Sequence, residues 1–346
     1  MSKIFIVAEI GVNHNGSVRT AKTLIDVARD AGCDAVKFQS FRADSLATRS
    51  ASKARYQKKN LPESGTQLAM LKRLELSWHD QKELYLYCRR RGIIFMSSPF
   101  DESSADFLDS LGMKIFKVPS GEITNEPLVR HIARKGKPII LSTGMSYLSE
   151  VGEAVGWIRG ERRRNNAGDD LVLLHCVSSY PTRMGDVNLL AMKTMASEFG
   201  LPIGLSDHTL GIEVPIAAVA MGACVIEKHI TLSRFMKGPD HRASIEPDEL
   251  KKMVMAIRNI ERAMGDGVKR PVRSELDTRL TMRRSLVAAR DIKVGEMING
   301  RDICAKRAGN GMGIERLREI VGVRAVKNIQ KDGLLKPEYF EKVSDR

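Results

Sequence analysis

The sequence predicts an α/β fold in which a (β/α)8 barrel, or TIM barrel, is followed by a small β-rich domain. Short β-branched runs alternate with longer segments of helical period, as the strands and helices of parallel βα units do. Eight such runs fall within about 260 residues, which matches the repeat number and size of this barrel. The composition changes after residues 265–267. We therefore expect a barrel over residues 1–266, a linker over 267–284 and a second domain over 285–346.

The eight expected strands are short apolar runs that end in polar residues. They lie at residues 4–8, 35–39, 93–97, 115–118, 138–142, 171–176, 203–205 and 224–228. Helical periodicity predicts helices in the segments between them. The clearest of these helices lie at residues 18–30, 78–91, 150–159, 188–199, 215–221 and 247–264.

Two segments fall outside this alternation. Residues 41–76, after the second strand, are polar and include a basic stretch at 53–59, and their length favours a lid or a substrate loop over a tight connection. Residues 269–284 form a charged linker. Beyond them, residues 285–326 offer short strands and turn glycines without a long helical period, which predicts that the second domain is rich in β-structure.

The composition favours an ordinary globular protein. Of the 346 residues, 42% are hydrophobic and 28% are charged, as in a large domain with a small one. The apolar run at 4–8 is too short for a signal peptide and is interrupted by Glu9, and no later run approaches the roughly 20 apolar residues of a membrane span. We expect a soluble, cytoplasmic protein. The five cysteines have no CxxC spacing, so neither a disulfide framework nor a zinc knuckle is predicted.

The formal net charge of +14 is compatible with nucleic acid, an anionic membrane or an anionic small substrate. Basic clusters at residues 89–91 and 162–164 end predicted helices, where cations suit the helix dipole. Aromatic residues make up only 5% of the chain, and no stacking platform for nucleic-acid bases is evident. We expect neither a nucleic-acid nor a membrane partner. A non-catalytic protein that binds nucleic acid or glycan is the alternative from a different class.

Polar residues follow nearly every expected strand, at the end of a barrel where active sites are built. They are Glu9, Lys37, Gln39, Ser97, Ser98, Lys117, Ser120, Glu122, Ser142, Thr143, His175, Ser178, Ser206, Asp207, His208, Glu227 and His229. So many charges would be costly in a dry core, because unpaired buried charges are strongly unfavourable. A ligand site explains these polar and charged residues better than a non-catalytic binding protein does.

Two lysines from different strands predict a site for a small dianionic phosphate ester. Lys37 and Lys117 would supply the charge, and the hydroxyl donors would be Ser98, Ser120, Ser142 and Ser206. The alternative is that each lysine pairs with a carboxylate of the protein.

Two histidines predict a metal site. His208 and His229 close the seventh and eighth strands, so they are neighbours that could share a divalent cation. Two imidazoles without a thiolate suit manganese, zinc, cobalt or iron(II) better than calcium. Glu227 faces the same side of its strand as His229 and could orient the ligand or move a proton. The alternative is a pair of hydrogen-bonded structural histidines.

Nine motifs in a fixed order resemble those of the sialic acid synthase family, and the resemblance runs from residue 4 to about residue 329. They lie at residues 8–16 (AEIGVNHNG), 36–39 (VKFQ), 98–100 (SPF), 117–122 (KVPSGE), 141–145 (LSTGM), 205–209 (LSDHT), 227–229 (EKH), 238–241 (GPDH) and 307–311 (RAGNG). Each fragment alone is weak, but their joint order is highly specific.

This resemblance implies a TIM barrel followed by an antifreeze-like SAF domain, in a domain-swapped homodimer whose small domain caps the partner's active site. Phosphoenolpyruvate would contact Lys37, Ser98, Lys117, Ser120, Ser142, Ser178 and Ser206. The metal, Mn²⁺ above Mg²⁺ or Co²⁺, would be held by His208 and His229. The sugar would face Gln39, Tyr180 and Asp240, together with Arg307 from the other chain.

Two positions depart from the family pattern. Ser178 stands where some bacterial members have Asn, which puts one substrate contact in doubt. Ala308 replaces a proline usual in the loop of the small domain, so the loop that carries Arg307 is less restricted.

The reaction implied is a carbon–carbon bond-forming transfer. Phosphoenolpyruvate, N-acetylmannosamine in its open-chain form and water would give N-acetylneuraminate and phosphate, with Glu9, Glu122 and Glu227 as the catalytic carboxylates. Two alternatives keep the enzyme and change the sugar. A 2,4-diacetamido-2,4,6-trideoxymannose would give N,N'-diacetyllegionaminate, and N-acetylmannosamine 6-phosphate would give a 9-phosphate. The basic residues that could bind that 6-phosphate, or could merely be solvated, are Lys53, Arg55, Lys58 and Lys59.

Overall fold

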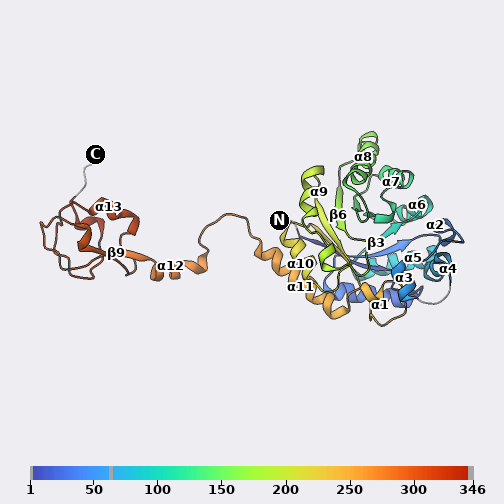
Figure 1. Ribbon diagram of the computed structural model, residues 1–346, viewed down its shortest axis with the longest axis horizontal. Coiled ribbons are helices and arrows are strands. Elements are labelled where there is room, and N and C mark those ends of the chain that lie inside the picture. The colour runs from blue at the N-terminus through green and yellow to red at the C-terminus, as the bar shows by residue number, and fades with distance from the viewer. Residues whose placement is uncertain (1–2, 62–64, 342–346) are drawn as a thin grey trace. The chain divides into compact units, whose positions relative to one another are not determined.

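The computed structural model describes residues 3–61 and 65–341 and divides the chain into two compact units, Met1–Asp266 and Gly267–Arg346 (Figure 1). The first unit is a barrel of eight parallel strands. These are β1 (Phe5–Gly11), β2 (Ala35–Ser40), β3 (Ile94–Pro99), β4 (Phe116–Val118), β5 (Ile139–Ser142), β6 (Leu171–Cys176), β7 (Ile203–Asp207) and β8 (Val225–His229). Their order is β3-β2-β1-β8-β7-β6-β5-β4, and β3 packs against β4 to complete the ring. The predicted fold class is confirmed.

Each strand is followed by a helix on the outside of the barrel (Figure 1). In chain order these helices are α1 (Val18–Ala31), α5 (Trp78–Arg91), α6 (Glu102–Ser110), α7 (Glu126–Arg134), α8 (Leu148–Arg164), α9 (Ala191–Phe199), α10 (Glu213–Ala220) and α11 (Pro247–Ala263). Helix α1 illustrates why they form here. Ser17 caps its first turn, Gly32 ends it with a φ of 88°, and its buried residues recur at helical spacing on one face.

Several strands run further than the apolar periodicity predicts. β1 continues to Gly11, β3 to Pro99 and β7 to Asp207, and β2 and β8 each run one residue further, because backbone hydrogen bonding to the neighbouring strands does not require apolar side chains. Glu9 pairs in register with Lys37 of β2 on one side and with His229 of β8 on the other. The extensions therefore bring polar residues of different strands to the same level of the barrel.

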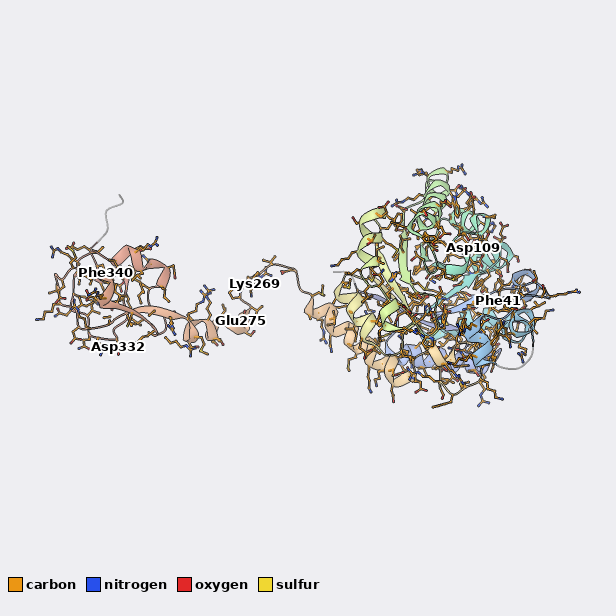
Figure 2. The ribbon with its side chains drawn as sticks, in the orientation of Figure 1. Phe41, Asp109, Lys269, Glu275, Asp332 and Phe340 are labelled. Carbon is orange, nitrogen blue, oxygen red and sulfur yellow. The ribbon has the colours of Figure 1, made fainter. Side chains whose placement is uncertain are left out.

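The segment after β2 is partly helical instead of a simple loop. It contains α2 (Ala43–Leu46), α3 (Arg55–Asn60) and α4 (Gln67–Leu74), and residues 62–64 of it lie outside the described part. Phe41, which Figure 2 labels, packs in a small separate core with Met70, Leu74 and Val12 of the loop after β1. This core holds the segment beside the end of β1.

The second unit contains a two-stranded antiparallel sheet, β9 (Arg284–Ala288) and β10 (Ile303–Arg307), and several isolated β-bridges. Its own core includes Leu286, Ile292, Leu335 and Phe340 (Figure 2). The segment expected as a charged linker carries a short helix, α12 (Leu276–Met282).

Among the described residues, no helix has both the length and the apolar character needed to cross a membrane.

Candidate active site

The interior of the barrel is built in layers, with an apolar layer below a polar one. The apolar layer contains Val7, Ala35, Met96, Ile115, Ile140, Leu174 and Val225. Side chains on a strand alternate between the two faces, so the residue two positions further along each strand lies directly above. Those residues are Glu9, Lys37, Ser98, Lys117, Ser142, Cys176 and Glu227. The predicted polar strand ends therefore meet in one layer.

The same alternation turns other predicted strand-end residues away from the interior. His175 lies between two inward residues and contacts the Val187 carbonyl oxygen with Nε2 at 2.6 Å. Asp207 forms a buried ion pair with Lys228, its register partner on β8, and Ser97 contacts Ser40. These three polar residues stabilise the outer layer of the barrel and are not part of the interior site.

Lys37 lies at the centre of the first group of polar contacts. Its Nζ is 2.5 Å from Glu9 Oε2, 3.3 Å from Ser98 Oγ and 3.9 Å from Glu227 Oε2. Gln39 Nε2 donates to Glu9 Oε1 at 3.3 Å. Gly11, with a φ of 54°, lets Glu9 lie close to the backbone, because a Cβ at this position would stand 2.9 Å from Glu9 Oε1.

Glu227 joins the second lysine to this group. Its Oε1 is 3.3 Å from Lys117 Nζ and accepts a hydrogen bond of 2.9 Å from Ser206 Oγ. All four charged residues, Glu9, Lys37, Lys117 and Glu227, are buried. Each predicted lysine thus has a carboxylate partner, as the alternative reading of the sequence proposed.

The two carboxylates of this cluster differ in proton affinity. Burial raises the pKa of Glu9 to about 7, although Lys37 beside it acts in the opposite direction. Burial alone would also raise the pKa of Glu227, but Lys117 and Lys37 together outweigh it and lower that pKa to about 2. Near neutral pH, Glu227 is therefore ionised while Glu9 can gain or lose a proton. Carboxylates with separated pKa values are typical of catalytic sites.

The remaining predicted serines lie beside the loop after β5. Ser120 Oγ accepts a hydrogen bond from the Gly144 backbone N–H at 2.9 Å. A Cβ at Gly144 would stand 2.3 Å from Ser178 Oγ and 2.9 Å from Ser120 Oγ, so only glycine fits between these hydroxyls. Ser142 is buried, and its Oγ has no hydrogen-bond partner in the described structure. Hydroxyls and a close backbone are features of a site that receives an anion.

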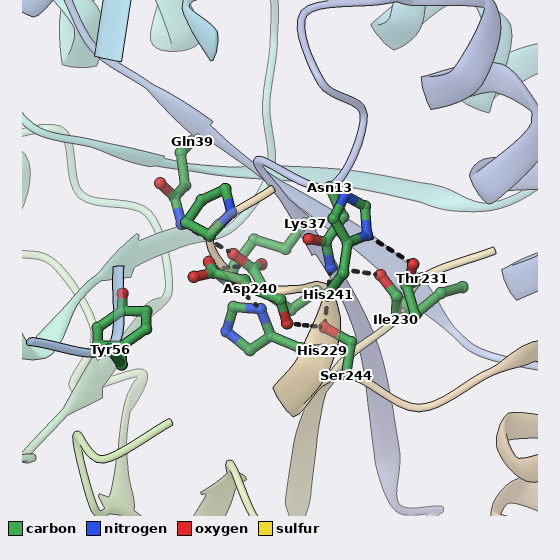
Figure 3. A network of polar contacts seen from close by, with 12 residues as sticks. Asn13, Lys37, Gln39, Tyr56, His229, Ile230, Thr231, Asp240, His241 and Ser244 are labelled. Carbon is green, nitrogen blue, oxygen red and sulfur yellow. Dashed lines mark hydrogen bonds and ion pairs between the residues drawn. The ribbon is translucent and has the colours of Figure 1, made fainter. Parts of the chain in front are cut away.

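His208 and His229 come together with Tyr180 and Asp240. The two imidazole rings are 5.2 Å apart between centroids, and the Tyr180 ring is 4.1 Å from His208 and 5.7 Å from His229. Asp240 Oδ2 lies 4.0 Å from His229 Nδ1 (Figure 3). Burial raises the pKa of Asp240 to about 6.

The chemistry of these donors fits a divalent cation. The Nδ1 atom of His208 contacts the Val177 carbonyl oxygen at 2.9 Å, which leaves Nε2 available. His229 Nδ1 and Asp240 Oδ1 are buried without a hydrogen-bond partner in the described structure. Burial, with His208 as a second cause, lowers the pKa of His229 well below its usual value and keeps the imidazole neutral, as a ligand must be. The described residues contain no group of three or more metal-binding side chains.

The segment after β2 contributes two residues that sequence reasoning missed. Tyr56 of α3 stacks on Tyr180 at 4.9 Å between ring centroids, and it lies close enough to Asp240 to lower the pKa of that carboxyl against the effect of burial. Asn60, four residues further on the same helix, donates to the Pro239 carbonyl oxygen at 2.6 Å. Their i, i+4 spacing could have indicated that both face the site, because residues four apart share one face of a helix. The basic stretch around them obscured it.

Two predicted residues are not brought into these contacts. Glu122 is half-buried and accepts a hydrogen bond from Asn125 at 2.7 Å, and burial raises its pKa. Arg307 is exposed at the end of β10 in the second unit. Its predicted role depends on another copy of the chain and stays a prediction.

Comparison with known proteins agrees with this architecture. The family model described as "NeuB family" matches residues 24–269, and the SAF domain model matches residues 283–341. The chain is 50% identical to N,N'-diacetyllegionaminic acid synthase of Legionella pneumophila, over 97% of this chain and 94% of that protein. It is 48% identical to the protein of the same name from Campylobacter jejuni, over 97% of this chain and all of that protein.

A solved structure is also similar. The N-acetylneuraminic acid (sialic acid) synthetase of Leptospira borgpetersenii, in complex with citrate, has a TM-score of 0.69 and 35% sequence identity, over 80% of this chain and 90% of that chain. The motifs, the barrel with its polar layer and these matches agree. The chain belongs to the NeuB family, the sialic acid synthase family that its sequence resembles, and carries a SAF domain at residues 283–341.

Proposed function

We propose that the protein is an N,N'-diacetyllegionaminate synthase that condenses phosphoenolpyruvate with 2,4-diacetamido-2,4,6-trideoxymannose and water. The polar layer, in which two lysines and two carboxylates of separated pKa lie beside two histidines, supports the reaction type. The two relatives at 50% and 48% identity over nearly the whole chain support the sugar. N-acetylmannosamine, which we expected from the motifs as the main acceptor, becomes the second candidate.

The arrangement of α3 disfavours a 6-phosphorylated sugar. Arg55, Lys58 and Lys59 are exposed, while Tyr56 and Asn60 of the same helix contact the site. The fourth cation, Lys53, is buried and donates to the Leu61 carbonyl oxygen at 2.9 Å. This arrangement supports a sugar without a 6-phosphate.

Phosphoenolpyruvate would bind where Lys37 and Lys117 converge. In the free protein these ammonium groups are paired with Glu9 and Glu227, so a dianion must compete with carboxylates. The raised pKa of Glu9 lets this carboxylate take up a proton. Glu9 then no longer neutralises Lys37, whose ammonium group can bind the substrate. Glu227 stays ionised and would stabilise the positive charge that develops at C2.

The chemistry forms one carbon–carbon bond and one carbon–oxygen bond, to water, and breaks the carbon–oxygen bond to phosphate. C3 of phosphoenolpyruvate attacks the sugar aldehyde, whose oxygen takes a proton and becomes a hydroxyl. Water adds at the cationic C2 and loses a proton. The C2–O bond to phosphate then breaks, and the leaving phosphate takes the proton of the C2 hydroxyl, which becomes the ketone. Glu9, between Lys37 and Gln39, is placed to give the proton to the aldehyde oxygen. Glu122, whose pKa burial raises, would accept the proton of water, although it lies outside the contacts of the polar layer. A divalent cation held by His208 and His229 would supply Lewis-acid polarisation of the aldehyde.

We further propose the swapped homodimer. Arg307 is exposed and forms no side-chain hydrogen bond or ion pair within the described residues, and a guanidinium suits the acetamido carbonyl of the sugar. Arg307 would therefore complete the sugar site of the other protomer.

The experiment that tests the substrate compares kcat/KM for the three sugars at saturating phosphoenolpyruvate, with mass spectrometry of the product. We expect the trideoxy sugar to give the highest value and a nine-carbon acid bearing two acetamido groups. A higher value for N-acetylmannosamine would transfer the proposal to that sugar.

A further inference from the structure

Asn13 holds two loops of the barrel together. It lies in the loop between β1 and α1 and is 1% exposed. Its Nδ2 donates to the Ile230 carbonyl oxygen and to Ser244 Oγ, each at 2.8 Å (Figure 3). Both acceptors belong to the loop between β8 and α11. The amide therefore joins the end of the first strand to the loop that follows the last one.

This connection continues to Asp240. Ser244 Oγ, which accepts from Asn13, donates to the Asp240 carbonyl oxygen at 2.8 Å. The base of the loop is closed by hydrogen bonds from Thr231 N to Ile245 O at 3.0 Å and from Ile245 N to His229 O at 2.9 Å. Asn13 thus reaches the backbone of Asp240 through one intervening hydroxyl.

Neighbouring contacts leave Asp240 little freedom. The His241 ring is fully buried against Thr231, with Nδ1 and Oγ1 2.7 Å apart. A Cβ at Gly238 would stand 2.5 Å from that ring, so the loop can pass there only as glycine. Asn60 holds the Pro239 carbonyl oxygen from the other side. The loop is packed tightly enough for a change at Asn13 to move the carboxylate.

The orientation of the Asn13 amide is determined by its partners. A flipped amide would place Oδ1 against the Ile230 carbonyl oxygen, which cannot donate. In the observed orientation Oδ1 has no partner in the described structure, although leaving a buried polar group unpaired is unfavourable. In Figure 3 this oxygen lies on the side of Lys37 and Asp240, opposite the Ile230 and Ser244 contacts. A side chain chosen only for stability would not carry this unpaired oxygen.

We propose that Asn13 is a positioning residue for Asp240, and through it for the acceptor sugar. The inference rests on the proposed function, in which the lysines bind phosphoenolpyruvate, and on the sugar contact that the family resemblance implies for Asp240. Asn13→Leu keeps the approximate volume and removes both donors. We expect the KM for the sugar to rise at least about tenfold, while the Kd for phosphoenolpyruvate, measured calorimetrically, stays within about twofold.

Gln81→Met is the matched control. Gln81 is also 1% exposed, and its Nε2 donates to the Leu76 carbonyl oxygen at 3.2 Å while its Oε1 accepts from Ser40. It is a buried amide on α5, outside the interior layer. We expect both variants to lower the midpoint of thermal unfolding. Only Asn13→Leu should raise the KM for the sugar while leaving the Kd for phosphoenolpyruvate nearly unchanged. Parallel changes in both substrate constants, or no change in either, would overturn the proposal.

Ser244→Ala provides the second test. Since Asn13 acts through Ser244, the double variant should raise the sugar KM no more than the stronger single variant does. Multiplicative effects would mean that Asn13 acts by another route.

Hydrogen exchange separates this inference from the proposed function. Asn13→Leu should speed exchange at the backbone amides of residues 243–245, whose bonds close the loop, and Gln81→Met should not. If Asn13→Leu speeds this exchange but the wild-type protein turns over none of the sugars, the proposed function is contradicted and the positioning of Asp240 by Asn13 still holds. Unchanged exchange at these amides would overturn the positioning role itself.

Discussion

Lys117 on β4 and Glu227 on β8 meet across the interior of the barrel, with Nζ 3.3 Å from Oε1, although four steps of the strand order separate their strands. The contact joins opposite sides of the ring. It holds the Glu227 carboxylate ionised in a buried layer, close to where positive charge would develop on the substrate.

Glu227→Gln should separate binding from chemistry. Removing this negative charge leaves Lys37 and Lys117 less neutralised, so phosphoenolpyruvate should bind at least as tightly. Turnover should fall by about a hundredfold or more, because an electrostatic contact to the transition state is lost. Steady-state kinetics and calorimetry measure the two effects. Glu161→Gln is the control, since Glu161 is buried on α8, where it pairs with Arg130 of α7 away from the barrel interior, and its loss should lower stability without changing kcat. Weaker phosphoenolpyruvate binding in Glu227→Gln would contradict the assigned role.

Phosphoenolpyruvate binding should take up a proton above neutral pH. The pKa of Glu9 is about 7 in the free protein, and a bound dianion would raise it further, so Glu9 gains a proton on binding at pH 7.5–8 and affinity falls as pH rises. Calorimetry in two buffers of different ionisation enthalpy measures this uptake. Glu9→Gln should abolish it, and uptake that persists in this variant would assign the proton to another group.

Removing one partner of the buried Lys228–Asp207 ion pair should lower the free energy of unfolding more than replacing both partners with apolar residues. Lys228 and Asp207 are almost fully buried, and Lys228 Nζ also donates to the Thr209 carbonyl oxygen at 2.7 Å. Lys228→Met alone leaves a buried carboxylate without its cation and should lower the free energy of unfolding by about 3–5 kcal/mol. Combining it with Asp207→Leu should recover part of that loss in urea unfolding. An additive loss would show that the pair itself contributes little.

Mixing two inactive variants tests the swapped dimer. Lys37→Met disables the phosphoenolpyruvate site, and Arg307→Ala removes the guanidinium that the partner would supply. After mixing and subunit exchange, half of the dimers are mixed and each contains one intact site, so activity should return to roughly a quarter of the wild-type value. Failure to recover activity, with mixed dimers verified by mass spectrometry, would place Arg307 at the site of its own chain or outside the site.

The barrel and its polar layer were predictable because both depend on local alternation along each strand. Val7 and Glu9 illustrate this, since a two-residue step places the second directly above the first. The pairing of Lys117 with Glu227 was not predictable, because it depends on the ring closing and on which side chains reach its centre. Tyr56 and Asn60 were missed because the basic stretch around them obscured their spacing, and because the packing of Phe41 and Met70 against Val12, which holds their segment beside β1, joins residues distant in sequence. The acceptor sugar depended on comparison with relatives, because the motifs do not distinguish it.

The measurement that tests the central claim most directly is phosphate release from phosphoenolpyruvate with Mn²⁺, using each of the three candidate sugars, with and without EDTA. The account predicts release that requires a sugar, is fastest with 2,4-diacetamido-2,4,6-trideoxymannose and is lost with EDTA or in the His208→Ala and His229→Ala variants. Absence of release with all three sugars, or release that continues at the same rate in EDTA, would contradict it.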